Sequence, residues 1–335
     1  MHIKLCAFCG LNMSYYIKNI KVNSKVVLAP MAGVTNIAYR KMCKKYGAGM
    51  VTTEMISDKG IFYNDKKTKD LALIDDIEHP VAIQIFGGEI DTLVNAAKWV
   101  ENNTKADVID INMGCPVMKV LKSDAGSMYL KDPERIYKTV KSIVENVNIP
   151  VTVKIRLGFD HNSVNVFDTV KAIIDAKASA IVIHGRTKSD LYSGEVNYDL
   201  IRQVKEKYPD FPIIVNGDIN SPVKAKEVLD FTKCDAVMIG RASYGNPYIF
   251  KQIDHYLNTG ELLEDMKFAD KIEVLKEYSK DLMNYKGEYI AMRELRGQAG
   301  WFVKGCKDGA KIRLKLSNIK TYDELLEILD SIETN

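Results

Sequence analysis

Eight short runs of apolar, largely β-branched residues recur along this chain, and a segment long enough for an α-helix follows most of them. The runs occupy residues 26–31, 50–55, 81–86, 108–113, 151–155, 180–183, 213–215 and 236–239. Strands that are apolar nearly throughout are buried on both faces, which is typical of a parallel sheet covered by crossover helices. Eight such units favour a closed barrel, so we expect an α/β protein with a (β/α)8 TIM barrel.

The segments between the runs have apolar residues at helical spacing. Ile136, Val140 and Ile143 share one face of such a helix, and Asp132 before Pro133 is a typical helix start. We expect helices over residues 91–101, 133–146, 167–177, 198–208 and 222–231. A doubly wound open sheet is the alternative fold, but its first strand should lead into a Gly-x-Gly-x-x-Gly turn. No such turn follows residues 26–31.

The strand pattern ends near residue 250, and the remaining chain has helical spacing. We therefore expect a lead-in strand or tail over residues 1–25, a catalytic barrel over residues 26–250 and a smaller all-helical domain over residues 251–335. The formal net charge is +3, but residues 286–320 contain nine basic and three acidic residues. A basic segment of this kind suits a polyanionic partner.

Composition narrows the class of protein further. Hydrophobic residues at 46% and charged residues at 27% are typical of a globular chain and exclude disorder for most of it. Because no apolar stretch is long enough for a membrane span and the first residues lack a signal-peptide pattern, we expect a cytoplasmic protein. Six scattered cysteines favour reduced thiols. Cys6 and Cys9 have the spacing of half a zinc site, but the other half is missing, so we assign no metal.

Most of the runs end in glycine or in polar residues. A (β/α)8 barrel collects the carboxyl ends of its strands at one rim, where active sites form. We therefore expect the residues at these ends to form one site. The candidates are Pro30, Met31, Ala32, Gln84, Asn112, Cys115, Lys154, His184, Arg186, Asn216, Gly217, Asp218, Gly240 and Arg241.

Three of these positions indicate particular chemistry. Cys115 precedes a proline at the mouth of the barrel, and this setting favours a catalytic thiol over a packing residue. Lys154 lies inside a strand, where its charge requires either an anionic ligand or an ion pair with Asp110, and the sequence leaves both open. Residues 216–218 and 240–241 follow the last two strands, where such barrels often bind phosphate, so we expect a phosphorylated ligand.

With these motifs in order, residues 26–320 resemble the tRNA-dihydrouridine synthases, specifically the bacterial DusB-like branch. The motifs that carry the resemblance are Ala29-Pro30-Met31-Ala32-Gly33, Glu54-Met55, Gln84-Ile85-Phe86-Gly87, Asn112-Met113-Gly114-Cys115-Pro116, Lys154-Ile155-Arg156, His184-Gly185-Arg186-Thr187, Asn216-Gly217-Asp218 and Gly240-Arg241-Ala242.

The resemblance implies an FMN-dependent oxidoreductase that takes hydride from NADPH and reduces the C5–C6 bond of a uridine in the D-loop of tRNA. It implies that hydride passes from flavin N5 to C6 and that Cys115 supplies the proton to C5. The residues that would bind FMN are Pro30, Met31, Ala32, Gln84, Lys154, His184, Asn216, Gly217, Asp218, Gly240 and Arg241.

The resemblance also implies that the helical domain binds tRNA. We expect no obligate protein partner and a monomeric protein. The residues expected to contact the substrate are Asn112, Arg186, Arg293, Arg296, Lys304 and Arg313. The chain departs from the family pattern at Gly297-Gln298, where relatives usually have a basic residue followed by histidine.

Two other functions fit parts of the sequence. A dihydroorotate dehydrogenase is also an FMN barrel that acts on a pyrimidine, but such enzymes lack a basic helical domain after the barrel. A non-catalytic RNA-binding protein could retain the barrel, although the presence of Cys115, Lys154 and the two phosphate loops argues against it.

Overall fold

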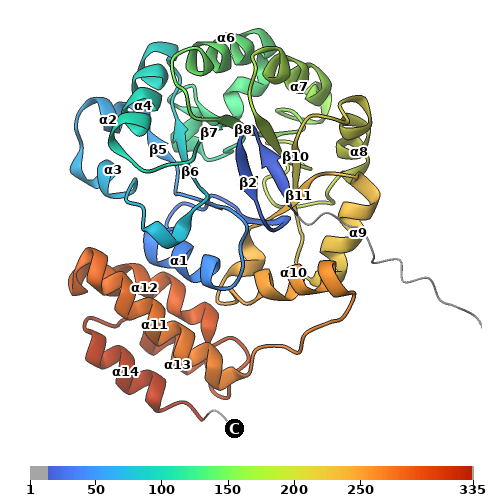
Figure 1. Cartoon of the computed structure of the whole chain (residues 1–335). Coiled ribbons are helices and arrows are strands. Elements are labelled where there is room, and N and C mark those ends of the chain that lie inside the picture. The colour runs from blue at the N-terminus through green and yellow to red at the C-terminus, as the bar shows by residue number, and fades with distance from the viewer. Residues whose placement is uncertain (1–13, 334–335) are drawn as a thin grey trace, which may run out of the picture.

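The eight predicted runs form a parallel barrel in the computed structural model of the chain, which describes residues 14–333 (Figure 1). Neighbouring strands follow the order β3-β11-β10-β9-β8-β7-β6-β4, and a short β5 also pairs with β6. The strands are β3 (Val26–Leu28), β4 (Val51–Thr52), β5 (Ile56–Ser57), β6 (Val81–Phe86), β7 (Val108–Asn112), β8 (Val151–Arg156), β9 (Ala180–His184), β10 (Ile213–Asn216) and β11 (Ala236–Ile239).

Backbone hydrogen bonds close the sheet between its first and last members. The Leu28 N–H donates to the Met50 carbonyl at 2.9 Å, and the Gly49 N–H donates to the Val26 carbonyl at 2.8 Å. These bonds join β3 to the chain that enters β4. The predicted (β/α)8 barrel is therefore confirmed, and the doubly wound open sheet is wrong.

Helices cover the outside of the barrel, and all five predicted helices are present. Asp132 accepts a hydrogen bond from the Arg135 N–H at 3.0 Å and caps the helix that starts at Pro133. The helices are α1 (Ile37–Lys45), α2 (Asp58–Phe62), α3 (Lys66–Asp70), α4 (Ile90–Asn103), α5 (Met118–Leu121), α6 (Pro133–Val144), α7 (Val166–Asp175), α8 (Tyr198–Lys207), α9 (Pro222–Thr232) and α10 (Ile249–Thr259), with 3-10 turns η1 (Asp76–Glu78), η2 (Gly126–Lys131), η3 (His161–Ser163) and η4 (Arg241–Ser243).

An antiparallel hairpin of β1 (Tyr15–Ile17) and β2 (Ile20–Val22) covers the amino end of the barrel. Its buried Ile17 and Val22 belong to one apolar cluster with side chains from inside the barrel, among which Ala82 and Ala236 are small enough to leave room for them. Residues 14–25, the described part of the predicted lead-in segment, thus close the amino end of the barrel, and the opposite rim is left as the opening. Cys6 and Cys9 lie outside the described residues.

A second layer of helices lies beside α1 and α10 (Figure 1). It consists of α11 (Phe268–Lys286), α12 (Glu288–Phe302), α13 (Gly309–Leu316) and α14 (Tyr322–Asp330). Helix α11 packs on α1 and α12, whereas α10 packs on α9 and β3, so the predicted boundary at residue 250 falls at the start of a helix that packs on the barrel. Within residues 14–333, no helix is long and apolar enough to cross a membrane.

The hairpin plug makes a test of stability possible with two neighbouring residues. Ile17 is fully buried, and Tyr16 beside it is 53% exposed. We expect Ile17→Ala to lower the free energy of unfolding by about 2–4 kcal/mol, because it leaves a cavity in the barrel interior. Tyr16→Ala should change it by less than about 0.5 kcal/mol. Urea denaturation measures both free energies. An effect of Ile17→Ala as small as that of Tyr16→Ala would show that the hairpin does not stabilise the barrel.

Candidate active site at the rim of the barrel

A cavity of about 680 Å³ opens at the carboxyl ends of the strands. It brings together residues that are up to 215 positions apart in the chain, from Ala29 to Tyr244. The predicted site residues that line it are Pro30, Met31, Ala32, Gln84, Asn112, Cys115, Lys154, His184, Asn216, Gly217, Asp218, Gly240 and Arg241. A groove of about 930 Å³ beside α11 contains none of the predicted site residues.

A chain of buried hydrogen bonds forms one wall of the cavity. Asp110 accepts from Gln84 Nε2 at 2.7 Å and from Thr152 Oγ1 at 2.6 Å. Gln84 Oε1 in turn accepts from Asn112 Nδ2 at 2.8 Å, and Asn112 Oδ1 accepts from the Cys115 N–H at 2.9 Å. Burial raises the pKa of Asp110, against the effect of these two donors. The chain fixes the amide orientations of Gln84 and Asn112 and connects them to the cysteine.

Lys154 projects from β8 into the cavity. Its Nζ donates to Asn216 Oδ1 at 3.1 Å, and Asn216 Nδ2 donates to the Met238 carbonyl at 2.9 Å. Burial, and to a smaller extent the positive charge of Arg156, lower the pKa of Lys154 to about 8. Because both oxygens of Asp110 already accept hydrogen bonds from other side chains, the geometry favours an anionic ligand for Lys154 over the ion pair.

His184 lies at the end of β9 and is neutral. Burial lowers its pKa to about 2, with further contributions from the nearby positive charges of Lys154 and three arginines. Its Nδ1 is buried and has no hydrogen-bond partner among the described residues. A ligand with a suitable polar atom would satisfy this nitrogen, since buried polar groups in folded proteins are almost always paired.

The two predicted phosphate loops lie side by side. Arg241 Nη2 is 2.9 Å from Asp218 Oδ1, and the other carboxylate oxygen of Asp218 accepts from Arg186. These pairs lower the pKa of Asp218, with the hydrogen bond from Arg186 as the largest cause. Gly217 has a φ of +132°, which favours glycine at this turn.

Cys115 lies between β7 and α5 and faces the cavity. Burial raises the pKa of its thiol, so the group is protonated at neutral pH. Its carbonyl accepts from the Ser127 N–H at 3.1 Å. A Cβ at Gly126, whose φ is +61°, would approach that carbonyl oxygen to 2.7 Å, so the close packing of the two segments requires glycine.

The five predicted substrate-contact arginines and lysines lie outside this cavity. Arg186 is buried and donates to the Ser193 carbonyl at 2.8 Å, and Arg296 donates to the Ile319 carbonyl at 2.7 Å. Arg293 on α12, Lys304 in the turn after α12 and Arg313 on α13 are exposed.

Gln298, the position of the departure from the family pattern, contacts the barrel. Its Nε2 donates to the Gly33 carbonyl at 2.7 Å, and its Oε1 accepts from the Tyr278 hydroxyl. Asn36, which caps α1, donates to the same hydroxyl at 2.9 Å. Because Gly33 directly follows the cavity residues 30–32, the helical layer is connected to the wall of the site.

Sequence reasoning missed two aromatic residues of the cavity. Tyr192 follows β9 in a loop of polar residues, and Tyr244 follows η4. The ring of Tyr244 stacks on Trp301 of α12, with centroids 4.2 Å apart. Neither tyrosine lies at the end of a strand. A search for polar residues and glycines at strand ends, which identified the other candidates, therefore does not find them.

The chain is thus a (β/α)8 barrel protein with a cationic cavity and a thiol at the rim where barrel enzymes have their active sites. The family model of dihydrouridine synthase matches residues 27–335. The tRNA-dihydrouridine synthase B of Vibrio vulnificus is 38% identical over 320 residues, which are 95% of this chain and 98% of that protein. The tRNA-dihydrouridine synthase B of Pseudomonas aeruginosa is 37% identical over 302 residues, which are 90% of each chain. A probable tRNA-dihydrouridine synthase of Rickettsia conorii is 36% identical over 325 residues, which are 95% of this chain and 98% of that protein.

The chain therefore belongs to the dihydrouridine synthase family and is an oxidoreductase. The predicted family is confirmed, and the dihydroorotate dehydrogenase alternative is wrong.

The lowered pKa of Lys154 predicts a pH-dependent effect on stability. An unfolded lysine keeps its proton to about pH 10.4, whereas folded Lys154 loses it near pH 8. The folded chain therefore carries the cost of a buried charge below pH 8, and this cost declines as the pH rises toward 10. We expect Lys154→Met to raise the free energy of unfolding of the ligand-free protein by about 1–3 kcal/mol at pH 7.

Urea denaturation at pH 7 and at pH 10 measures the effect, with Lys98→Met on the exposed side of α4 as the matched control. The gain from Lys154→Met should be much smaller at pH 10. An equal gain at both pH values would mean that packing of the methionine, and not removal of the charge, stabilises the variant.

Proposed function

We propose that this chain is a tRNA-dihydrouridine synthase that uses FMN and NADPH to reduce the C5–C6 bond of a uridine in the D-loop of tRNA. One observation carries the proposal: a single cavity holds a protonated thiol, a buried lysine and two adjacent phosphate-type loops. The printed names of its relatives, which describe tRNA-dihydrouridine synthases, agree with it. Since its substrate is tRNA, we place the enzyme in the cytoplasm, and we propose that it acts as a monomer.

The residues present fit FMN. Residues 216–218 and Gly240-Arg241 would hold the phosphate, with the Arg241 guanidinium as its cation. Lys154 would neutralise negative charge on the ring system, and the unpaired Nδ1 of His184 would meet a polar atom of the ligand. Pro30, Met31, Ala32 and Gln84 would form the remaining wall. When bound, FMN supplies to C6 the hydride that NADPH provides.

Cys115 would donate the proton that the reaction requires at C5. Its raised pKa keeps the proton on sulfur at neutral pH, which suits a general acid better than a nucleophile. The resulting thiolate regains its proton from solvent. Asn112 would act as a positioning residue, because its amide is occupied by Gln84 and by the Cys115 N–H.

We propose that residues 26–250 form the catalytic domain and residues 251–335 the tRNA-binding domain, with α10, which packs on the barrel, as the connection between them. Exposed Arg293, Lys304 and Arg313 would contact tRNA phosphates. Arg186 and Arg296 donate to backbone carbonyls, so they would support binding through the segments that they hold.

Replacement of the thiol tests the catalytic assignment. Cys115→Ala should bind FMN as the wild type does, because the thiol is not among the groups assigned to the cofactor. Its rate of dihydrouridine formation should fall by about 100-fold or more, the usual contribution of a general acid. Flavin absorbance and mass spectrometry of treated tRNA measure the two properties, and Cys306→Ala, in the helical layer, is the control. Unchanged turnover in Cys115→Ala would contradict the assignment.

Neutralisation of the helical layer tests the RNA surface. We expect Arg293→Gln, Lys304→Gln and Arg313→Gln together to weaken tRNA binding and to reduce the slope of log K against log salt by about 2–3. Each phosphate that is no longer contacted keeps its counterions, so fewer counterions are released on binding. Filter binding at several salt concentrations measures this. Equal affinity would place the RNA surface elsewhere. The matched control removes three exposed charges from the outer helices of the barrel, at Lys138, Lys141 and Lys171.

A further inference from the structure

Two buried arginines hold the loop that follows β9. Arg156, from the end of β8, donates to the carbonyls of Thr187 and Leu191 at 2.7 and 2.8 Å. Arg186, just past the end of β9, donates to the carbonyls of Ser193 and Gly194. Hydrogen bonds from a charged donor are stronger than neutral ones. The loop is therefore held in one conformation from two neighbouring strands.

This loop keeps two apolar side chains in solvent. Leu191 has a φ of +51°, in the left-handed region that residues other than glycine seldom adopt. Its side chain is 50% exposed, and that of Tyr192 is 54% exposed. Such a backbone conformation costs about 1–3 kcal/mol and persists only where its surroundings impose it, most often at ligand sites. Because the two side chains bury little in the folded chain, packing of the fold does not account for their presence.

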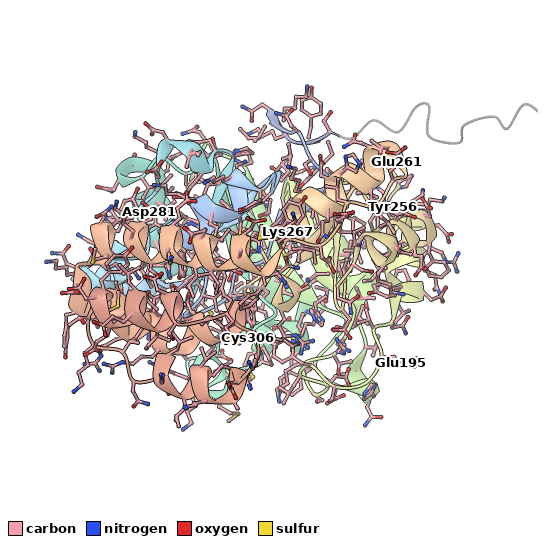
Figure 2. The ribbon with its side chains drawn as sticks, turned by 90° about the horizontal axis from the view of Figure 1, so that it is seen from below. Glu195, Tyr256, Glu261, Lys267, Asp281 and Cys306 are labelled. Carbon is pink, nitrogen blue, oxygen red and sulfur yellow. The ribbon has the colours of Figure 1, made fainter. Side chains whose placement is uncertain are left out.

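Tyr192 lies at the mouth of the cavity among positive charges. Its ring centroid is 4.8 Å from Cζ of Arg241 and 5.6 Å from Cζ of Arg156, and the ring meets His184 edge-on. Glu195, from the same connection between β9 and α8, lies near the lower edge of Figure 2, whereas Glu261, just past α10, lies toward its upper edge. Because Tyr192 lines the cavity and Leu191 precedes it, the exposed apolar pair lies at the cavity mouth, next to charges that attract phosphates.

We propose that Leu191 and Tyr192 form a stacking platform for a nucleobase next to the uridine that enters the cavity. The inference rests on the proposed function, since a uridine must leave its stack to reach a pocket in a protein. Its removal leaves a neighbouring base without a stacking partner. An aromatic side chain can replace that partner for any base, because every base has a π-face. The proposed ligand is thus an unpaired nucleobase of RNA.

The test uses FMN-loaded enzyme and unmodified tRNA transcript, with dissociation constants measured over a range of salt concentrations. Tyr192→Ala should raise the dissociation constant by about 5- to 100-fold, and Leu191→Ala should raise it less. The slope of log K against log salt should not change, because stacking releases no counterions. Tyr192→Phe should retain wild-type affinity. Tyr16→Ala removes an equally exposed tyrosine from the opposite end of the barrel, and it should have no effect.

FMN affinity, measured by flavin fluorescence, is determined for every variant. It should fall much less than the tRNA affinity does, because Arg156 and Arg186 hold the backbone of the loop whichever side chain stands at position 192. Unchanged tRNA affinity in both alanine variants would overturn the proposal. A flatter salt slope, or a loss of FMN affinity that matches the loss of tRNA affinity, would also overturn it. A wild-type holoenzyme that binds no tRNA would instead refute the proposed function.

Discussion

Two backbone hydrogen bonds between β3 and the start of β4 close the barrel, and the position of every site residue depends on that closure. Parallel strands in a closed sheet all end at one rim, so Pro30, after the first strand, and Arg241, after the last, line the same cavity. The hairpin of β1 and β2 covers the opposite end with apolar side chains. One rim is therefore packed as core, and the other is available for a ligand. The side chains that stabilise the barrel and the side chains available to bind a ligand therefore lie at opposite ends of its axis.

The electrostatics of the open rim are unfavourable without an anion. Lys154, Arg156 and Arg241 line the cavity, and Asp218 is the one carboxylate among the described residues that line it. That carboxylate is shared between Arg241 and Arg186. The low pKa of His184 and the lowered pKa of Lys154 have a common origin, because each lies in a buried region near other positive charges. A phosphorylated ligand would relieve both, because its negative charge would offset the neighbouring positive charges.

The strands, the main helices and the residues at the rim could be predicted from the sequence, because their apolar periodicity and strand ends are local patterns. The partner of Lys154 could not be predicted, since the choice between Asp110 and a ligand depends on which neighbours occupy the carboxylate. Only the register of β6, β7 and β8 decides that question. Tyr192 was missed for a related reason: its place at the cavity follows from hydrogen bonds between Arg156 and a loop 31 to 35 residues away. Such contacts leave no periodic signal.

The departure at Gln298 shows how the helical layer and the cavity depend on one another. Gln298 is buried and joins the Gly33 carbonyl to the Tyr278 hydroxyl, which also accepts from Asn36. Gly33 lies next to the cavity wall, and Asn36 caps α1, so one polar network supports both the wall and the helix on which α11 packs. Buried networks of this kind specify one arrangement of the groups they join, because an unpaired member is costly. An amide can serve here in place of histidine since it both donates and accepts. The helices that carry the basic residues are thereby fixed relative to the thiol, and RNA bound to the helical layer would approach the cavity in a defined orientation.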